Sequence, residues 1–142
     1  MSPSSAKHAR WQFRLGAEFG HRDVTDDVEA LVASSGVREG MAVVSLTGST
    51  GAVTTIEYEE GALADLRRAL DRVAPPNADY AHNERWGDGN GFSHIRSAVL
   101  KTSVAIPVVD GGLALGTWQQ IVVINLDNRT RDREVVAVVV GA

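Results

Sequence analysis

At 142 residues, with 44% hydrophobic and 23% charged residues, the chain has the size and composition of one globular domain, not of a disordered or fibrous protein. A formal net charge of −4 and the lack of any long basic run disfavour nonspecific binding to nucleic acid. Zero cysteines exclude disulfides, a thiolate nucleophile and sulfur ligands to zinc, which leaves nitrogen and oxygen ligation for any bound metal.

The two ends of the sequence carry no signal for export or membrane insertion. No apolar run follows the basic residues of the N-terminus, and the longest apolar run, VVAVVV at 135–140, is far below the roughly 20 residues that span a bilayer. We expect residues 1–9 to form a disordered tail and 10–142 a single domain. No membrane anchor and a cytoplasmic location are expected.

The first elements are a strand and a helix. WQFRLGAEF, residues 11–19, alternates apolar and polar side chains, which is the pattern of a half-buried strand. Thr25 is expected to cap the helix that follows, with Asp26 and Asp27 in its first turn, where the helix dipole favours acids. Gly36 is expected to end this helix.

Two strands and a second helix come next. The apolar run Met41–Leu46 and the β-branched run Ala52–Tyr58 each predict a strand, separated by the turn-like GSTG. Leucines at three- and four-residue spacing predict a helix over Gly61–Val73. The adjacent prolines Pro75 and Pro76 are expected to stop it.

A loop follows, and the rest of the chain is mainly β. Ser93–Leu100 predicts a short helix with Ser93 as its cap, after which three strands are expected, at Ser103–Val109, Leu113–Leu126 and Arg133–Val140. Strands interspersed with about three helices, without a regular βαβ repeat, indicate an α+β domain, not a doubly wound sheet.

The last predicted strand is rich in valine on both faces. This composition fits a strand that is covered on two sides. An oligomer would cover the second face most easily, because stable interfaces between identical chains are apolar. The alternative is a monomer in which helices cover that face.

The segment HNERWGDGNGFSH, residues 82–94, is the first candidate site. It places His82 and His94, two of only four histidines, at the ends of a glycine-, acid- and amide-rich stretch. Histidine is the side chain best suited to metal ligation or to proton transfer at neutral pH. The alternative is a pair of structural histidines that hold the loop in place by hydrogen bonds.

The same segment has features of a phosphate-binding loop. Asp88-Gly-Asn90-Gly is turn-rich, and the backbone N–H groups at the start of the following helix could attract a phosphate. Arg96, inside that helix, and Arg85 could add charge-assisted hydrogen bonds. The alternative is a mobile loop with solvated arginines.

Three stretches together resemble the YjbQ-like family, often labelled secondary thiamine-phosphate synthase. They are STGAVTTIEYE at 49–59, YAHNERWGDGNGFSHIRS at 80–97 and SVAIPVVDGGLALGTWQQI at 103–121. The resemblance extends over nearly the whole domain in the same order. Its most specific pieces are the segment from histidine to Ser-His, the Pro-Val-x-x-Gly turn and Gly-Thr-Trp-Gln.

The resemblance implies a fold, an assembly and an activity. The fold would be α+β, with a large mixed, mostly antiparallel sheet that curls toward a barrel, and the protein would assemble as a homotrimer. A histidine pocket would hold a divalent metal such as zinc, magnesium or manganese. The activity would be a weak thiamine-phosphate synthesis, in which a pyrimidine diphosphate joins a thiazole phosphate with loss of pyrophosphate.

Individual residues match the family's motifs. His82 matches its Tyr-x-His histidine and His94 its Ser-His histidine, so both are predicted to be catalytic residues or metal ligands. Asp88 and Asn90 lie in its acid- and amide-rich loop. Together with Arg96 and Trp118, they are predicted to bind the small phosphorylated substrate.

Gln119 completes the predicted catalytic set. In a strand, Trp118 and Gln119 would point to opposite faces, so at most one faces the pocket, and Gln119 is favoured. The alternative is a structural role for both residues, with Trp118 in the core and Gln119 as a polar group at the edge of the sheet.

Two positions depart from the family's pattern. Gly48 stands where the family usually has histidine, and Asn125 where it usually has glutamate. Two histidines alone bind a divalent ion more weakly than three and need further oxygen ligands. Asp88, Glu84 or Glu57 could supply one. A third departure is the pair Lys101-Thr102, which replaces a glycine.

Two functions follow from these residues. The first is a metal-assisted enzyme of the thiamine-phosphate synthase type that acts on small phosphorylated substrates. The second is a catalytically lapsed, trimeric protein that binds a ligand or a metal. The sequence contains no Walker motif, no Gly-x-Ser-x-Gly elbow and no His-Glu-x-x-His motif, so hydrolases and nucleotide-driven enzymes of these kinds have no support.

Overall fold

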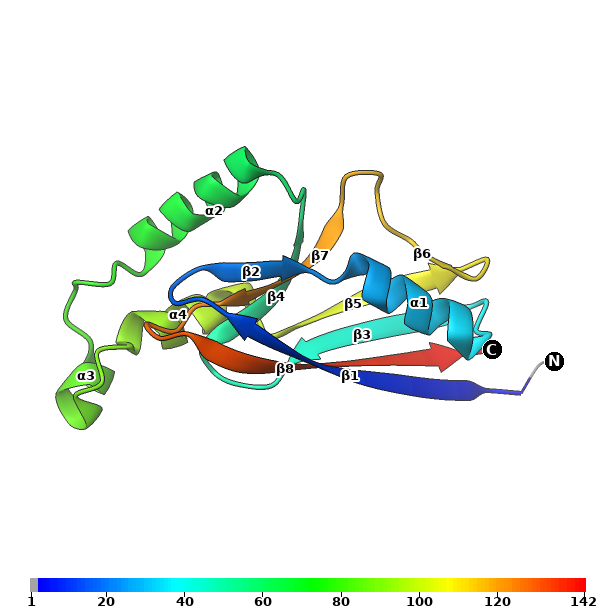
Figure 1. Cartoon of the computed structure of the whole chain (residues 1–142), viewed down its shortest axis with the longest axis horizontal. Coiled ribbons are helices and arrows are strands. Elements are labelled where there is room, and N and C mark those ends of the chain that lie inside the picture. Colours follow the sequence, from blue (N-terminus) through cyan, green and yellow to red (C-terminus); the bar gives the residue numbers. More distant parts are fainter. Residues whose placement is uncertain (1–2) are drawn as a thin grey trace.

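The computed structural model describes residues 3–142, in which eight strands and four helices follow one another along the chain (Figure 1). In chain order these elements are β1 (Ser5–Leu15), β2 (Gly20–Asp23), α1 (Thr25–Ser35), β3 (Gly40–Leu46), β4 (Gly51–Ile56), α2 (Glu60–Val73), α3 (Ala81–Trp86), α4 (Gly91–Leu100), β5 (Ser103–Val109), β6 (Gly112–Leu113), β7 (Gln120–Asn125) and β8 (Arg131–Gly141).

The strands form two antiparallel sheets that together curl into a half-barrel. One sheet has five strands in the order β1-β8-β3-β5-β6, and the other has three in the order β2-β7-β4. The longest ladder, in the five-stranded sheet, pairs β1 with β8 from Ser5 opposite Gly141 to Leu15 opposite Arg131. The α+β class is thus confirmed, with antiparallel pairing throughout the described strands.

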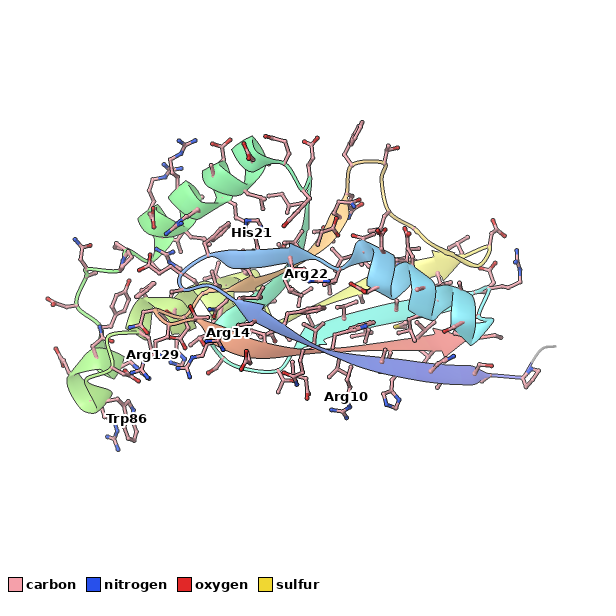
Figure 2. All side chains as sticks on the ribbon, viewed as in Figure 1. Arg10, Arg14, His21, Arg22, Trp86 and Arg129 are labelled. Atoms are coloured by element: carbon pink, nitrogen blue, oxygen red, sulfur yellow. The ribbon has the colours of Figure 1, made fainter. Side chains whose placement is uncertain are left out.

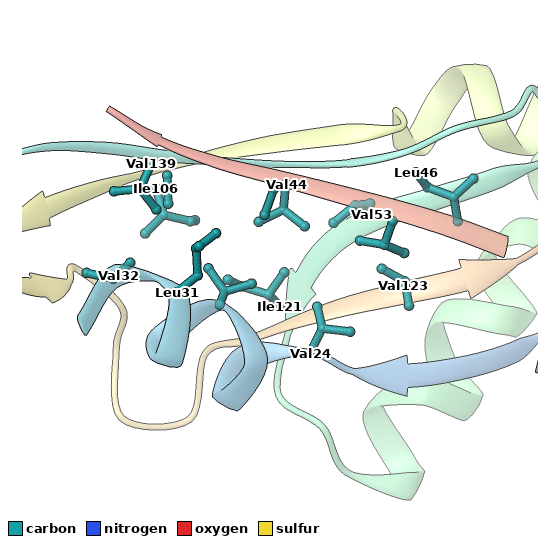
Figure 3. Close-up of a cluster of buried hydrophobic side chains, with 14 of the residues drawn as sticks. Val24, Leu31, Val32, Val44, Leu46, Val53, Ile106, Ile121, Val123 and Val139 are labelled. Carbon is teal, nitrogen blue, oxygen red and sulfur yellow. The ribbon is translucent and has the colours of Figure 1, made fainter. Parts of the chain in front are cut away.

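The core lies between the two sheets. Val44, Leu46 and Val139 of the five-stranded sheet face Val53 and Val123 of the three-stranded sheet (Figure 3). All five side chains are at most 2% exposed. Burial of each such side chain contributes about 1.5–3 kcal/mol. This packing is the reason why the alternating apolar patterns of the sequence form strands here.

The three-stranded sheet is buried on both faces because successive side chains of β7 point in opposite directions. Ile121 and Val123 enter the core between the sheets, whereas Val122 and Ile124 belong to a second apolar cluster that includes Leu63 and other residues of α2. Helix α2 therefore lies over the outer face of this sheet, as Figure 1 shows.

The helix boundaries differ slightly from those predicted. Helix α2 has Glu59 as its cap, and this carboxylate accepts hydrogen bonds from the N–H groups of Gly61 and Ala62. Helix α1 ends at Gly36 in the left-handed conformation, as expected. Thr25 is not its cap but its first residue, and the backbone N–H and hydroxyl of Thr25 both donate to Asp23 Oδ1.

The first strand is longer at its start and shorter at its end than predicted. Ser5–Ala9, expected to belong to a disordered tail, extend β1 because their backbone pairs with β8. The residues Met1 and Ser2 of that tail lie outside the described residues. At the other end the strand stops at Leu15, and a turn places the buried Phe19 just before β2.

Two segments of the second half also differ from the prediction. The loop after Pro76 contains the short helix α3, and α4 begins at Gly91 with Asn90 as its cap residue, not at Ser93. The strand expected over Leu113–Leu126 is two strands, because residues 114–119 form a loop between β6 and β7. This loop contains Trp118 and Gln119.

The valines of β8 divide between the core and an outer face. Val135, Ala137 and Val139 are fully buried, whereas Val136 and Val138 are half-buried and point to the other face of the sheet. The described helices pack elsewhere: α1 contributes to the core between the sheets, and α2 lies on the three-stranded sheet. Coverage of this outer face by helices, the monomeric alternative, is therefore not observed.

Candidate functional site

Helices α3 and α4 form a hairpin that carries the two candidate histidines. The turn between them depends on Gly87 and Gly89, both with φ near +71°, a conformation that favours glycine. Gly91 contacts Tyr80 so closely that an added Cβ would lie 2.5 Å from the Tyr80 Cβ. The side-chain oxygen of Asn83 accepts a hydrogen bond from the Gly91 N–H at 2.8 Å, which joins the start of α4 to α3.

The hairpin brings the imidazole rings of His82 and His94 together. Their centroids are 4.3 Å apart, with 41° between the ring planes. Asp88, in the intervening turn, places its Oδ1 3.4 Å from His82 Nδ1. The sequence prediction that these three residues share one site is consistent with this geometry.

The turn between β7 and β8 closes the site from the other side. Asn128 Nδ2 donates to the carbonyl oxygen of Asp88 at 2.9 Å, which links the two loops. Asp127 is 2% exposed, and its Oδ2 accepts hydrogen bonds from Thr50 Oγ1 and Arg131 Nε, each at 3.0 Å. Segments near residues 50, 90 and 130 thus meet at one end of the molecule. Figure 2 shows Trp86 and Arg129 at this same end.

Buried polar atoms without a hydrogen-bond partner are concentrated in this place. Among the described residues, the side-chain atoms of this kind all belong to the α3–α4 hairpin or to the β7–β8 turn: His82 Nδ1, Asn90 Oδ1, Ser93 Oγ, Asp127 Oδ1 and Asn128 Oδ1. A buried polar atom that lacks a partner costs about 1–3 kcal/mol. Two of these atoms have polar neighbours, because Asp88 Oδ1 lies 3.4 Å from His82 Nδ1 and the side chain of Asn90 lies within hydrogen-bonding reach of Asp127. The others mark a place where water or a ligand completes the structure.

The electrostatics of the site favour a neutral His94 and an ionised Asp127. Burial and the neighbouring His82 lower the pKa of His94, against the smaller opposing influence of Asp127 and Asp88. Burial raises the pKa of Asp127, but hydrogen bonds from Thr50 and Arg131 and the charge of Arg131 together lower it below its usual value. An imidazole that is neutral near pH 7 can accept a proton from a substrate.

A second polar group lies directly behind Asp127. Arg133 is 6% exposed, and its Nη2 donates to Thr50 Oγ1 and to Asn125 Oδ1, each at 2.7 Å. Asn125 is fully buried, and its Nδ2 donates to the carbonyl oxygens of Leu15, Gly16 and Arg129. The asparagine that replaces the family's usual glutamate therefore holds two segments, the end of β1 and the β7–β8 turn, and one guanidinium in place.

Gly48, the second departure, lies against the same arginine. Its φ of +142° suits glycine, and an added Cβ would lie 2.9 Å from Arg133 Nη1. There is consequently no room at this position for the histidine that the family usually has, unless Arg133 moves.

An open cleft of about 360 Å³ adjoins His94. Its lining residues include Gly48, Ser49, His94 and the pair Lys101-Thr102. This volume suits a small molecule. The pair Lys101-Thr102, which replaces a glycine of the family's pattern, thus places the lysine Lys101 in the wall of the cleft.

Trp118 and Gln119 lie far from this cleft. They precede β7, whereas Asn125 ends it, and a strand of this length separates its ends by roughly 17 Å. Gln119 Nε2 donates to Thr55 Oγ1 at 3.2 Å, and Trp118 lines a separate cleft of about 440 Å³ with Glu57. Because both residues lie in a loop, the prediction that they alternate across a strand is wrong.

Arg96 is placed in the core. It is 1% exposed, its Nη2 lies 2.8 Å from Asp71 Oδ1, and its Nε donates to the carbonyl oxygen of Ala74. Its guanidinium also lies over the ring of Phe92. These contacts tie α4 to the end of α2, so they argue against the predicted role of Arg96 in substrate binding.

The donor set of the site does not fit a divalent metal. Within residues 3–142, no group of three or more histidine, aspartate or glutamate side chains is arranged to hold a metal ion. Of the three predicted oxygen donors, only Asp88 lies beside the histidine pair, and Glu57 lines the distant cleft. Two imidazoles and one carboxylate in this arrangement do not supply a three-ligand site.

Sequence reasoning missed several residues of this site. They are Thr50, Ser93, Asp127, Arg131 and Arg133. One signal was available, since NLDNRTRDR, residues 125–133, places a dense run of polar residues directly after a fully buried strand. Such a run at the end of a core strand favours a functional turn over a simple connection.

No helix in the described part of the chain is long and apolar enough to cross a membrane.

Comparisons with known proteins agree over almost the whole chain. The family model described as "UPF0047 protein YjbQ-like" matches residues 10–142. A UPF0047 protein of Methanothermobacter thermautotrophicus is 37% identical over 84% of this chain and 81% of its own length. One from Archaeoglobus fulgidus is 37% identical over 77% of this chain and 83% of its own.

Solved structures show the same fold. A YbjQ-like protein of unknown function from Sulfolobus solfataricus has a TM-score of 0.93 at 26% identity, with 99% of this chain and 100% of that chain covered. An uncharacterised protein of the yjbq/upf0047 family from Clostridium acetobutylicum has a TM-score of 0.83 at 32% identity, with 92% and 98% covered. The chain therefore belongs to the YjbQ-like family, UPF0047.

Proposed function

We propose that this protein is a small-molecule enzyme in which His82 and His94 transfer protons on a phosphorylated substrate. The observation that carries the proposal is the pair of imidazoles, 4.3 Å apart, of which His94 lines an open cleft. Histidine is the side chain best suited to move a proton near neutral pH. The adjoining cleft of about 360 Å³ supplies the space.

The chemistry assigned to each residue follows from its surroundings. His94 lines the cleft, and its lowered pKa keeps it neutral near pH 7, so its ring has one N–H that can donate to the substrate and one nitrogen that can accept a proton. His82 lies against the ring of His94, and Asp88 lies beside His82 Nδ1. Ser49 and Thr102, which line the cleft, have hydroxyl groups that can hydrogen-bond to the ligand.

The finer proposal is a transfer of the thiamine-phosphate synthase type, as the family resemblance implies. In that reaction the ring nitrogen of a thiazole phosphate attacks the methylene carbon of a pyrimidine diphosphate, and pyrophosphate leaves. The nucleophile loses no proton, so the need is to neutralise charge on the departing pyrophosphate, to which a ring N–H of the histidine pair donates. Lys101 in the wall of the cleft supports such a role, and no step is assigned to a metal because the donor set does not fit one.

The test is turnover of the pyrimidine diphosphate and the thiazole phosphate by chelator-treated protein, with thiamine phosphate and pyrophosphate both quantified. We expect His82→Ala and His94→Ala each to lower kcat by about 100-fold or more, the usual effect of removing a hydrogen-bond donor to charge that develops in the transition state. His21→Gln, which changes a histidine on β2, is the matched control and should leave kcat unchanged. Equal turnover in all three variants would refute the assignment.

A second candidate function is a binding protein that has lost catalysis. The observation that favours it is the structural use of the two departing positions. Asn125 joins the end of β1 to the β7–β8 turn, and Gly48 contacts Arg133, so neither position retains a group for chemistry. Tight binding of phosphorylated ligands without turnover by the wild-type protein would select this function over the first.

We also propose that the protein assembles as a homotrimer through the outer face of the five-stranded sheet. Met41 is 46% exposed and Val140 36% exposed on neighbouring strands, beside the half-buried Val136 and Val138. An apolar sheet face of this kind is what stable interfaces between identical chains bury.

A further inference from the structure

Arg133 carries a buried positive charge that no carboxylate neutralises directly. The side chain is 6% exposed, and its hydrogen bonds go only to neutral acceptors, the side chain of Asn125 and the carbonyl and hydroxyl oxygens of Thr50. None of the ion pairs among residues 3–142 includes it. A buried charge without a partner of opposite sign is costly, so its presence requires an explanation.

The nearest acid does not remove this excess of charge. Asp127 interacts favourably with Arg133, but its Oδ2 is already bound by Arg131 Nε at 3.0 Å and by the hydroxyl of Thr50. Asp127 is thus shared between the half-exposed guanidinium of Arg131 and the buried guanidinium of Arg133. Arg133 has no carboxylate to itself, so an anionic group from outside the chain can pair with it.

The geometry places this charge directly behind Gly48, one of the residues that line the cleft. The hydrogen bonds of Arg133 use Nε and Nη2, whereas Nη1 lies beside Gly48, where a Cβ would be 2.9 Å away. Gly48 itself lines the cleft, as does the exposed Lys101. Because Gly48 has no side chain, no Cβ occupies the space beside Nη1.

We propose that Arg133 Nη1 and Lys101 Nζ form an anion subsite in the cleft, which binds one phosphate group of a small ligand without a metal. The guanidinium supplies a fixed, permanently charged donor, and the lysine supplies a mobile one. The hydroxyls of Ser49 and Thr102 border the same cleft and can donate further hydrogen bonds. The subsite lies beside His94, so a phosphate held there sets the reacting part of the ligand against the imidazole.

This subsite deepens the proposed function and rests on it for its meaning. It also explains the departure at position 48. A histidine there would contribute to a metal site, and a bound cation would then neutralise the phosphate. Here the glycine admits the guanidinium instead, so the chain itself supplies the positive charge.

The test is a titration of chelator-treated, isotopically labelled protein with inorganic phosphate, followed by NMR at constant ionic strength. We expect saturable shifts of the backbone N–H groups of Gly48, Ser49 and Thr102 that chloride does not reproduce. Phosphate should also raise the melting temperature, because a ligand that binds only the folded state stabilises it. Absence of saturable shifts at these residues would overturn the proposal.

Two variants test whether the side chains of Lys101 and Arg133 bind the phosphate. Lys101→Gln and Arg133→Gln should each weaken phosphate binding about tenfold or more, the usual effect of the loss of one charged hydrogen bond. Arg129→Gln, which changes an exposed arginine of the nearby turn, is the matched control and should bind phosphate as the wild type does. Lys101 is exposed, so its variant tests the subsite even if the buried Arg133→Gln chain does not fold.

The result also separates the subsite from the proposed catalysis. If phosphate shifts the NMR signal of the Gly48 N–H, and turnover survives in His82→Ala and His94→Ala, the proposed subsite stands and the catalytic assignment is rejected. Turnover that depends on both histidines but not on Lys101, with no phosphate shifts, would retain the catalytic assignment and reject the subsite. Binding that is abolished by the chelator and restored by zinc would contradict the metal-free proposal.

Discussion

The rings of His82 and His94 lie 4.3 Å apart although they project from different helices, and this pair sets the protonation of the site. A positive charge on one ring opposes a positive charge on the other. Together with burial, this repulsion lowers the pKa of His94. The pair thus retains one neutral imidazole near pH 7, which is the form that proton transfer requires.

The first prediction concerns this pKa. The His82→Ala variant should raise the pKa of His94 toward 6.5, because it removes the like charge and admits water to the ring. NMR titration of the His94 ring signals measures the change. In the wild type the pKa of His94 should lie below 6.5, and His21→Gln should leave it unchanged. An equal pKa for His94 in wild type and His82→Ala would contradict the coupling.

The lowered pKa of His94 also makes the free energy of unfolding depend on pH. The pKa of His94 is lower in the folded than in the unfolded chain, so the unfolded chain binds more protons just below pH 6.5. The contribution of His94 is therefore fully present above pH 6.5 and is lost as the pH falls toward its folded pKa. Denaturant unfolding of wild type and His94→Gln across this range should show a smaller pH slope for the variant.

The second prediction concerns the metal. The variant Gly48→His, which restores the family's usual residue, should not create a metal site. A side chain at this position meets Arg133 Nη1 and is strained at φ +142°, so we expect a loss of about 1–3 kcal/mol in the free energy of unfolding. Calorimetric titration with zinc and a denaturant melt measure both effects. Stoichiometric zinc binding with unchanged stability would show that Arg133 moves freely.

The third prediction concerns Asn125. Its replacement by alanine removes the donor to three carbonyl oxygens and the acceptor for Arg133 in a fully buried place. We expect a loss of roughly 3 kcal/mol or more, because several buried groups lose their partners. Chemical denaturation of this variant beside Asn77→Ala, an exposed asparagine, measures the difference. A similar small effect in both variants would argue against the role of Asn125 in joining the loops.

The fourth prediction separates structure from substrate binding at Arg96. Arg96→Lys loses the paired contacts with Asp71 and Ala74 and should lower the melting temperature. At a temperature where the variant is folded, its affinity for phosphate should equal that of the wild type, since the side chain is buried away from the cleft. Weakened phosphate binding in a folded Arg96→Lys protein would restore the predicted substrate role.

The fifth prediction concerns assembly. The variant Val138→Glu, on the outer face of the sheet, should dissociate the proposed trimer, because a buried charge without a partner is costly in an interface. Sedimentation velocity gives the mass of wild type and variant. Thr117→Glu, in the exposed loop before β7, is the control. A wild-type monomer at all concentrations would refute the assembly.

Local pattern determined much of the fold and one part of the site. Alternation over residues 11–15 and the leucine spacing of α2 predict a strand and a helix because each reflects burial of one face of one element. The same locality explains why His82, Asp88 and His94 were found, since one hairpin carries all three. The family that these motifs indicate is confirmed, because the family model matches residues 10–142.

Only the tertiary structure decided which distant residues complete the site. Antiparallel pairing of β7 with β4 brings Asp127 and Arg133 to Thr50, and no period in the sequence encodes such a long-range contact. The same pairing separates Gln119 from His94 along the length of β7. Burial decided the role of Arg96, because a charged side chain enters a core only where partners such as Asp71 accompany it. Local pattern thus determines elements, whereas side-chain partners depend on how those elements pack.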